Sequence, residues 1–147
     1  DDLVLIDDYA HHPTELDALY QGVSEMYPDD QKVIVFQPHL FSRTKDQADA
    51  FAKSLDQADQ VLLLPIYPAR ELPMEGVTSE LLIGKMNLTN KQVIDKAELI
   101  EWVKNVMLVE KKINEEDLNL FLLVDTADEA VDRIDEFYSK YLLKPNF

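Results

Sequence analysis

The residues best suited to chemistry lie in three short segments of this 147-residue chain, at positions 7–15, 37–44 and 65–71. They read DDYAHHPTE, QPHLFSRT and PIYPARE, and they contain all three histidines and two of the three arginines. Each segment follows a short apolar run of the kind that forms a buried strand. Because ligands of open parallel sheets bind beyond the carboxyl ends of the strands, we predict that the three segments meet in one ligand site.

Two chemistries fit such a site. In the first, Arg43 and a histidine bind a small carboxylate through charge-assisted hydrogen bonds, while an aspartate accepts from the hydroxyls of a ribose. The second is metal-assisted hydrolysis, for which carboxylates and imidazoles are suitable ligands. Its candidate ligands are Asp7, Asp8, His11, His12 and His39. Neighbouring side chains diverge on an extended segment, which makes the two adjacent histidines awkward ligands for one ion.

Each of these residues also has a purely structural interpretation. Pro13 suits the first turn of a helix, which would place His12 near the N-cap, and the aspartates at 7 and 8 could cap the same turn. His39 could be a hydrogen-bonded packing residue. The Arg-Glu pair at 70 and 71 could be a solvated ion pair in a loop. The convergence of the polar segments on one sheet edge favours a ligand site over these separate roles.

The elements that would position these segments recur along the chain. Apolar runs predict strands at 3–6, 33–36, 61–64, 92–94 and 120–124. Apolar stripes with helical period fall within 16–27, 48–58, 99–107 and 130–141. Since the strands follow one another at roughly the length of a βαβ unit, we predict an α/β, Rossmann-like fold with helices on both faces of a mainly parallel sheet of five or six strands. Residues 1–147 are expected to form a single domain.

The charge of the chain argues against two classes of partner. Asp and Glu total 29 against 14 Lys and Arg, a net charge of −15. Nucleic acids and anionic membranes would be repelled, because affinity for both depends on basic side chains. We see no apolar run near the roughly 20 residues that span a bilayer, no leader segment and no cysteine. We therefore expect a cytoplasmic protein that binds neither nucleic acid nor membrane.

The three segments, together with EGVTS at 75–79, resemble the C-terminal domain of the Mur ligases in order and spacing over residues 3–85. The resemblance is strongest to the members that join L-alanine to UDP-N-acetylmuramate. It implies an ATP-dependent amide ligation in peptidoglycan biosynthesis that proceeds through an acyl phosphate. It also implies that this domain is inactive alone, because upstream UDP-binding and central ATPase domains hold the UDP-sugar and most of the ATP and Mg²⁺.

The resemblance further implies roles for single residues. Asp8 matches the aspartate that contacts the ATP ribose. Tyr9 and His11 match positions beside the incoming L-alanine, whereas His39 and Arg43 match positions that bind its carboxylate. No residue of this domain is implied as a metal ligand. The supporting positions are His12, Thr44, Tyr67 and Arg70.

Two places depart from the family pattern. Leu40 stands where many members have an arginine, and Asp-Thr-Ala-Asp at 125–128 stands where the family usually has Gly-Ala-Gly-Asp. The function predicted from the sequence is the C-terminal domain of such a ligase. The alternatives are a metal-dependent phosphohydrolase that uses the Asp and His cluster, and a non-catalytic Mur-ligase-like binding domain.

Overall fold

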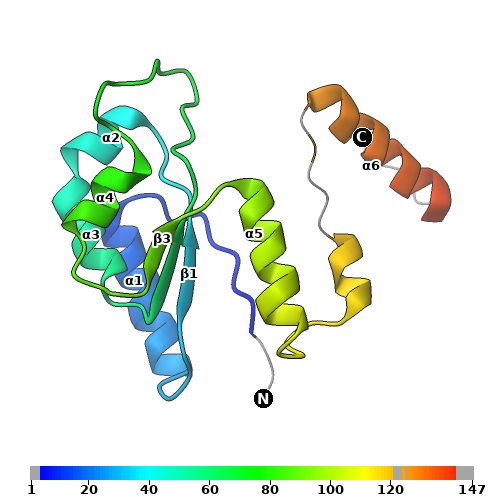
Figure 1. Cartoon of the computed structure of the whole chain (residues 1–147), viewed down its shortest axis with the longest axis horizontal. Coiled ribbons are helices and arrows are strands. Elements are labelled where there is room, and N and C mark those ends of the chain that lie inside the picture. The colour runs from blue at the N-terminus through cyan, green and yellow to red at the C-terminus, as the bar shows by residue number, and fades with distance from the viewer. Residues whose placement is uncertain (1–3, 121–123, 125, 142–147) are drawn as a thin grey trace. The chain divides into compact units, whose positions relative to one another are not determined.

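The computed structural model describes residues 4–120, 124 and 126–141, and it divides into two compact units (Figure 1). One contains the chain up to Leu99, and the other begins at Ile100. All predicted site residues lie in the first, which we call the site unit. The assignment of residues 1–147 to one domain stays a prediction.

The site unit is built on a parallel sheet in the order β1-β2-β3. Its strands are β1 (Val33–Phe36), β2 (Gln60–Leu63) and β3 (Lys91–Val93). The register pairs Phe36 with Leu63 and Leu63 with Val93, so these three side chains share one face. The predicted α/β class, the parallel pairing and the three central strands are confirmed.

The predicted number of strands is wrong: the described residues contain three, not five or six. The expected first strand fails because Val4, Leu5 and Ile6 are exposed and belong to no ladder. An apolar, β-branched run becomes a strand only when a neighbouring backbone pairs with it. Of the expected last strand, residues 121–123 lie outside the described residues, while Leu120 ends a helix and Val124 has no regular structure.

Three helices cover one face of this sheet: α1 (Pro13–Met26), α3 (Ala48–Leu55) and α4 (Ser79–Lys85) (Figure 1). Their buried side chains join those of the strands in one core. This core includes Leu16, Phe36, Phe51, Leu55, Leu63 and Leu82. On the opposite face Leu62 is fully buried, but Val35 beside it is 45% exposed, so the two faces are covered unequally.

The unit from Ile100 is helical in the part that the structure describes. Helix α5 (Lys96–Trp102) leads into a π-helix, η1 (Val103–Leu108). A 3-10 helix, η2 (Glu115–Leu120), and α6 (Ala127–Tyr141) follow. The helices predicted from the stripes at 99–107 and 130–141 are confirmed. Asp125, in the segment that departs from the family pattern, lies outside the described residues.

One carboxylate joins the end of α3 to the turn before β3. Asp56 accepts hydrogen bonds from the backbone N–H groups of Asn87, at 2.8 and 2.9 Å, and Leu88, at 2.9 Å, and from the Asn87 amide at 3.0 Å. Partial burial alone would raise the pKa of Asp56, but these hydrogen bonds outweigh it and hold the pKa below its ordinary value. The ionised carboxylate therefore stabilises the fold.

Replacing Asp56 with alanine should lower the free energy of unfolding by about 1–3 kcal/mol at pH 7, since two backbone donors lose their acceptor. Because the folded pKa is lowered, this contribution is present above the unfolded pKa and is lost as the pH falls through the folded value. Urea unfolding of the wild type and of Asp56→Ala should therefore show a difference in the free energy of unfolding at pH 7 that becomes smaller at pH 3. Asp30→Ala, an exposed acid, is the control; a difference independent of pH would contradict the assignment.

Candidate functional site

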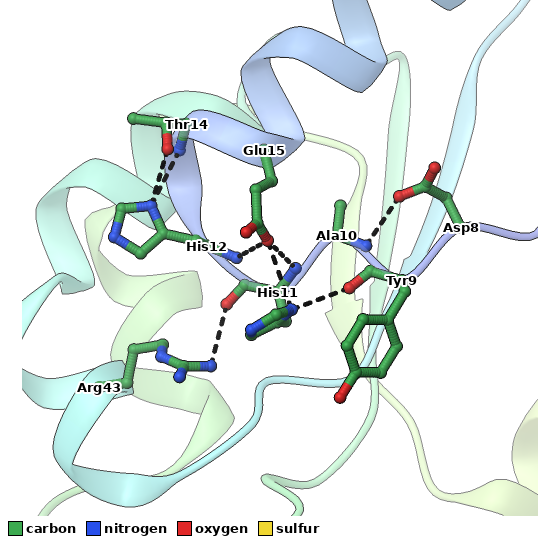
Figure 2. Close-up of polar contacts among 8 residues, drawn as sticks. All are labelled: Asp8, Tyr9, Ala10, His11, His12, Thr14, Glu15 and Arg43. Carbon is green, nitrogen blue, oxygen red and sulfur yellow. Dashed lines mark hydrogen bonds and ion pairs between the residues drawn. The ribbon is translucent and has the colours of Figure 1, made fainter.

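The segment before α1 is held by two acidic side chains (Figure 2). The Asp8 Oδ1 accepts from the backbone N–H of Ala10 at 2.7 Å. The Glu15 Oε2 accepts from the N–H groups of His11, at 2.9 Å, and His12, at 3.0 Å. The His11 N–H is the main cause that lowers the pKa of Glu15, which keeps this carboxylate ionised at neutral pH.

His11 is oriented by its own backbone neighbour. Its Nδ1 lies 2.9 Å from the carbonyl oxygen of Tyr9 and 3.3 Å from the Glu15 carboxylate. A carbonyl only accepts, so Nδ1 carries the proton in this arrangement, and Nε2 of the neutral ring is left with its lone pair. The Tyr9 ring lies 4.9 Å from the His11 ring, and Tyr9 is 84% exposed.

His39 comes from the corner after β1. A single parallel bridge pairs it with Tyr67, and the two rings stack at 5.5 Å. The His39 ring meets the His11 ring edge-on at 6.2 Å. Its Nδ1 is buried and has no hydrogen-bond partner among the described residues. The stacking on Tyr67 agrees with the interpretation of His39 as a packing residue, but Nδ1 lacks the hydrogen bond that a buried polar atom normally makes.

Arg43 brings a cation to the same place. It lies on α2 (Phe41–Asp46), and its Nη1 donates to the carbonyl oxygen of His11 at 3.4 Å (Figure 2). The side chain is half-buried, and within the described part of the chain no carboxylate pairs with it. A guanidinium has five N–H donors, so most of its capacity is available to a ligand.

The structure thus brings together side chains from all three segments, since Tyr67 of the third segment stacks on His39 of the second, whose ring meets that of His11 in the first. His11 contacts both of the other residues of the second segment: its ring meets the His39 ring, and its backbone carbonyl accepts from Arg43. Asp8, Tyr9 and His11 line a shallow hollow of about 230 Å³, together with Ala10 and Glu15. The convergence that the sequence predicts is present, and the ligand roles of these residues remain predictions.

The four supporting positions have different surroundings. His12 is the N-cap of α1, with Nδ1 2.9 Å from the Thr14 hydroxyl, so the capping predicted for the aspartates at 7 and 8 is wrong. Thr44 is fully buried and donates to the carbonyl of Leu40 at 2.8 Å. Tyr67 stacks on His39. Arg70 is exposed and points to no partner that the described residues supply.

Sequence reasoning missed two acidic residues that shape the site. Glu15 holds the backbone N–H groups of His11 and His12, as described above. The carboxylate of Glu71 accepts from the backbone N–H of Ser42 at 2.9 Å and from the Ser42 hydroxyl. The interpretation of Glu71 as the solvated partner of Arg70 is therefore wrong. Its acidic type was visible in the sequence, but nothing local could reveal a partner 29 residues away.

The described residues contain no group of three or more His, Cys, Asp or Glu side chains arranged to hold a metal ion. Nor is any helix in the described ranges both long enough and apolar enough to span a bilayer.

A parallel α/β sheet with histidines, an arginine and tyrosines gathered at one edge defines the class of this domain. The family model described as "Mur ligase, glutamate ligase domain" matches residues 1–122. The chain belongs to the Mur ligase family, which confirms the resemblance seen in its motifs.

Curated relatives agree with the family match. The UDP-N-acetylmuramate–L-alanine ligase of Flavobacterium johnsoniae is 58% identical over 104 residues, covering 71% of this chain and 23% of that protein. The protein of the same name from Christiangramia forsetii is 60% identical over 104 residues, with the same coverage. That of Parabacteroides distasonis is 38% identical over 145 residues, covering 99% of this chain and 30% of its own length. The chain spans about a quarter of these relatives.

Replacing Glu15 with alanine should speed the hydrogen exchange of the His11 and His12 amides at pH 7, because both lose their acceptor. Since the pKa of Glu15 is lowered in the folded state, its contribution is present above the unfolded pKa and disappears as the pH falls through the folded value. Exchange measured on a peptide covering residues 9–16, corrected for intrinsic rates, should therefore differ more between the two proteins at pH 7 than at pH 3. Glu25→Ala, at the other end of α1, is the control. Equal protection at pH 7 would refute the role of Glu15.

Proposed function

We propose that this chain is the C-terminal, amino-acid-binding domain of a ligase that adds L-alanine to UDP-N-acetylmuramate and converts ATP to ADP. The observation that carries the proposal is the convergence of His11, His39 and Arg43 in a chain that belongs to the Mur ligase family. The names of its relatives supply the substrates. The reaction places the full-length protein in the cytoplasm and in cell-wall biogenesis.

The chemistry divides between this domain and the upstream domains of the full-length protein. ATP phosphorylates the lactyl carboxylate of the sugar, and the amine of L-alanine then attacks the acyl phosphate and releases phosphate. This domain would bind the amino acid and close the site against water, which would otherwise hydrolyse the activated carboxyl group. We expect the isolated domain to be inactive.

The carboxylate of L-alanine would bind to Arg43 and His39. The planar guanidinium of Arg43 can donate two parallel hydrogen bonds to the two carboxylate oxygens, and its single contact with the His11 carbonyl leaves donors for them. The unpartnered Nδ1 of His39 supplies a further polar atom in the same place. Tyr9 and His11 would pack beside the methyl group and the amine.

The ATP ribose would bind to Asp8. One oxygen of its carboxylate accepts from Ala10, and the other has no hydrogen-bond partner among the described residues. That second oxygen suits a ribose hydroxyl. The chain has only three glycines, Gly22, Gly76 and Gly84, and none lies in a phosphate-binding loop. The ATP phosphates, Mg²⁺ and UDP-N-acetylmuramate would therefore bind mainly to the upstream domains.

The test is ADP release by the full-length protein. The proposal requires release that depends on both L-alanine and UDP-N-acetylmuramate, and it fails if either can be omitted without effect. A protein that binds ATP but never consumes it would instead be a non-catalytic member of the family. The metal-dependent phosphohydrolase is not favoured by the family match, and phosphodiester cleavage by the isolated chain with Mn²⁺ or Zn²⁺ would revive it.

Replacing Arg43 with alanine in the full-length protein should raise the KM for L-alanine by about 10- to 100-fold, since a charge-assisted pair of hydrogen bonds is lost. The KM for ATP should change by less than about twofold. Steady-state kinetics with each substrate varied in turn provides the measurement. Lys45→Ala removes an exposed cation from the same helix and should leave both constants unchanged. Equal increases in the two KM values would contradict the role of Arg43.

A further inference from the structure

Helix α2, which carries Arg43, has no N-cap side chain of its own. Its N-cap residue is Leu40, whose apolar side chain cannot accept from the N–H groups of the first turn. Leu40 also adopts φ 73° and ψ 132°, in a region that non-glycine residues rarely occupy. Such a backbone conformation is strained and persists only where the surroundings hold it.

The 65–77 loop, which follows β2, supplies the missing cap. The Glu71 carboxylate accepts from both the backbone N–H and the hydroxyl of Ser42, the second residue of α2. A tight turn directs Glu71 there: its N–H donates to the carbonyl of Pro68 at 2.9 Å, and Ala69 adopts φ 50° within this turn. The cap of α2 thus comes from a residue 29 positions further along the same chain, not from the helix itself.

The same loop also forms backbone hydrogen bonds with the residues around Leu40. The N–H of Leu40 donates to the carbonyl of Tyr67 at 3.0 Å, and the N–H of Tyr67 donates to the carbonyl of Pro38 at 2.8 Å. The hydrogen bonds of Glu71 and those of the Tyr67 backbone therefore both connect the 65–71 segment to the residues at the start of α2. The start of this helix is therefore held by the loop as well as by its own hydrogen bonds.

The Glu71 carboxylate is ionised in this arrangement. The Ser42 hydroxyl and N–H, followed by the Phe41 N–H and the positive charge of Arg43, hold the pKa of Glu71 below its ordinary value. An ionised carboxylate at the first turn also complements the partial positive charge of the helix N-terminus.

Arg43 follows Ser42 directly, so the guanidinium belongs to the residue next to the one that Glu71 caps. The contact of Arg43 with the His11 carbonyl is long, at 3.4 Å, and a small displacement of the helix would break it. We propose that Glu71 is a positioning residue of the amino-acid site: it clamps the first turn of α2 and thereby holds the Arg43 guanidinium beside His11 and His39. This inference rests on the proposed function, and it adds a residue that acts through Arg43 rather than on the substrate.

The test is a double-mutant cycle in the full-length protein. Glu71→Ala should raise the KM for L-alanine by about 10-fold, while kcat and the KM for ATP change by less than about twofold. Because Glu71 acts through Arg43, the double variant Glu71→Ala/Arg43→Ala should have the same KM as Arg43→Ala alone. Glu71→Gln, which keeps one acceptor oxygen, should recover part of the loss. Multiplication of the two single effects in the double variant would overturn the proposal, as would an unchanged KM.

A second measurement separates this proposal from the proposed function. Hydrogen exchange of the 41–46 peptide in the full-length protein should be faster in Glu71→Ala than in the wild type. Glu75→Ala is the matched control, because Glu75 is an exposed acid of the same loop that makes no hydrogen bond to any described residue. Unchanged exchange in Glu71→Ala would overturn the clamp whatever the substrate. Faster exchange in a protein whose ADP release ignores L-alanine would reject the proposed function and the amino-acid role of Glu71, while leaving the cap itself in place.

Discussion

The hydrogen bond from the Arg43 guanidinium to the carbonyl of His11 joins the two segments on which the site depends. One segment precedes α1 and is not anchored by a strand in the described residues. The other follows β1, which lies in the sheet. A second direct contact between the two segments is the edge-on approach of the His11 and His39 rings, at 6.2 Å. The sheet therefore supports only the segment after β1, and a long-range polar contact joins the segment before α1 to it.

Acidic side chains provide the local order around this contact. Glu15 accepts two hydrogen bonds at the start of α1, and Glu71 accepts two at the start of α2. Both carboxylates have lowered pKa values because the donors they meet stabilise the ionised form. In a chain with a net charge of −15, these two acids serve structure rather than solubility alone. Among the described residues neither acid forms an ion pair with Arg43, although its charge acts on Glu71, so N–H donors of the guanidinium remain for an anion.

The sequence was a reliable guide wherever the deciding information is local. Apolar periodicity located α1, α3 and α6, and the apolar runs at 33–36, 61–64 and 92–94 gave the three strands to within a residue or two. His39 and Arg43 were correctly expected beyond the carboxyl end of β1, where ligands of parallel sheets bind. His11 reaches them without a preceding strand, so that rule holds for only one of the two segments. The run at 3–6 failed because strand formation depends on a neighbour that the run itself does not specify. Glu71 was misread for the same kind of reason: its partner, Ser42, is distant in sequence, and the positive φ of Leu40 has no signal in a leucine.

The central claim is that His39 and Arg43 bind the carboxylate of an amino acid, and imidazole nitrogen resonances report on this most directly. In the full-length protein, the His39 signals can be assigned by comparison with His39→Gln. Addition of L-alanine should shift the Nδ1 resonance of His39, whereas L-alaninamide, which lacks the carboxylate charge, should not, and Arg43→Ala should abolish the shift. Equal shifts with both compounds, or no shift with L-alanine, would contradict the account.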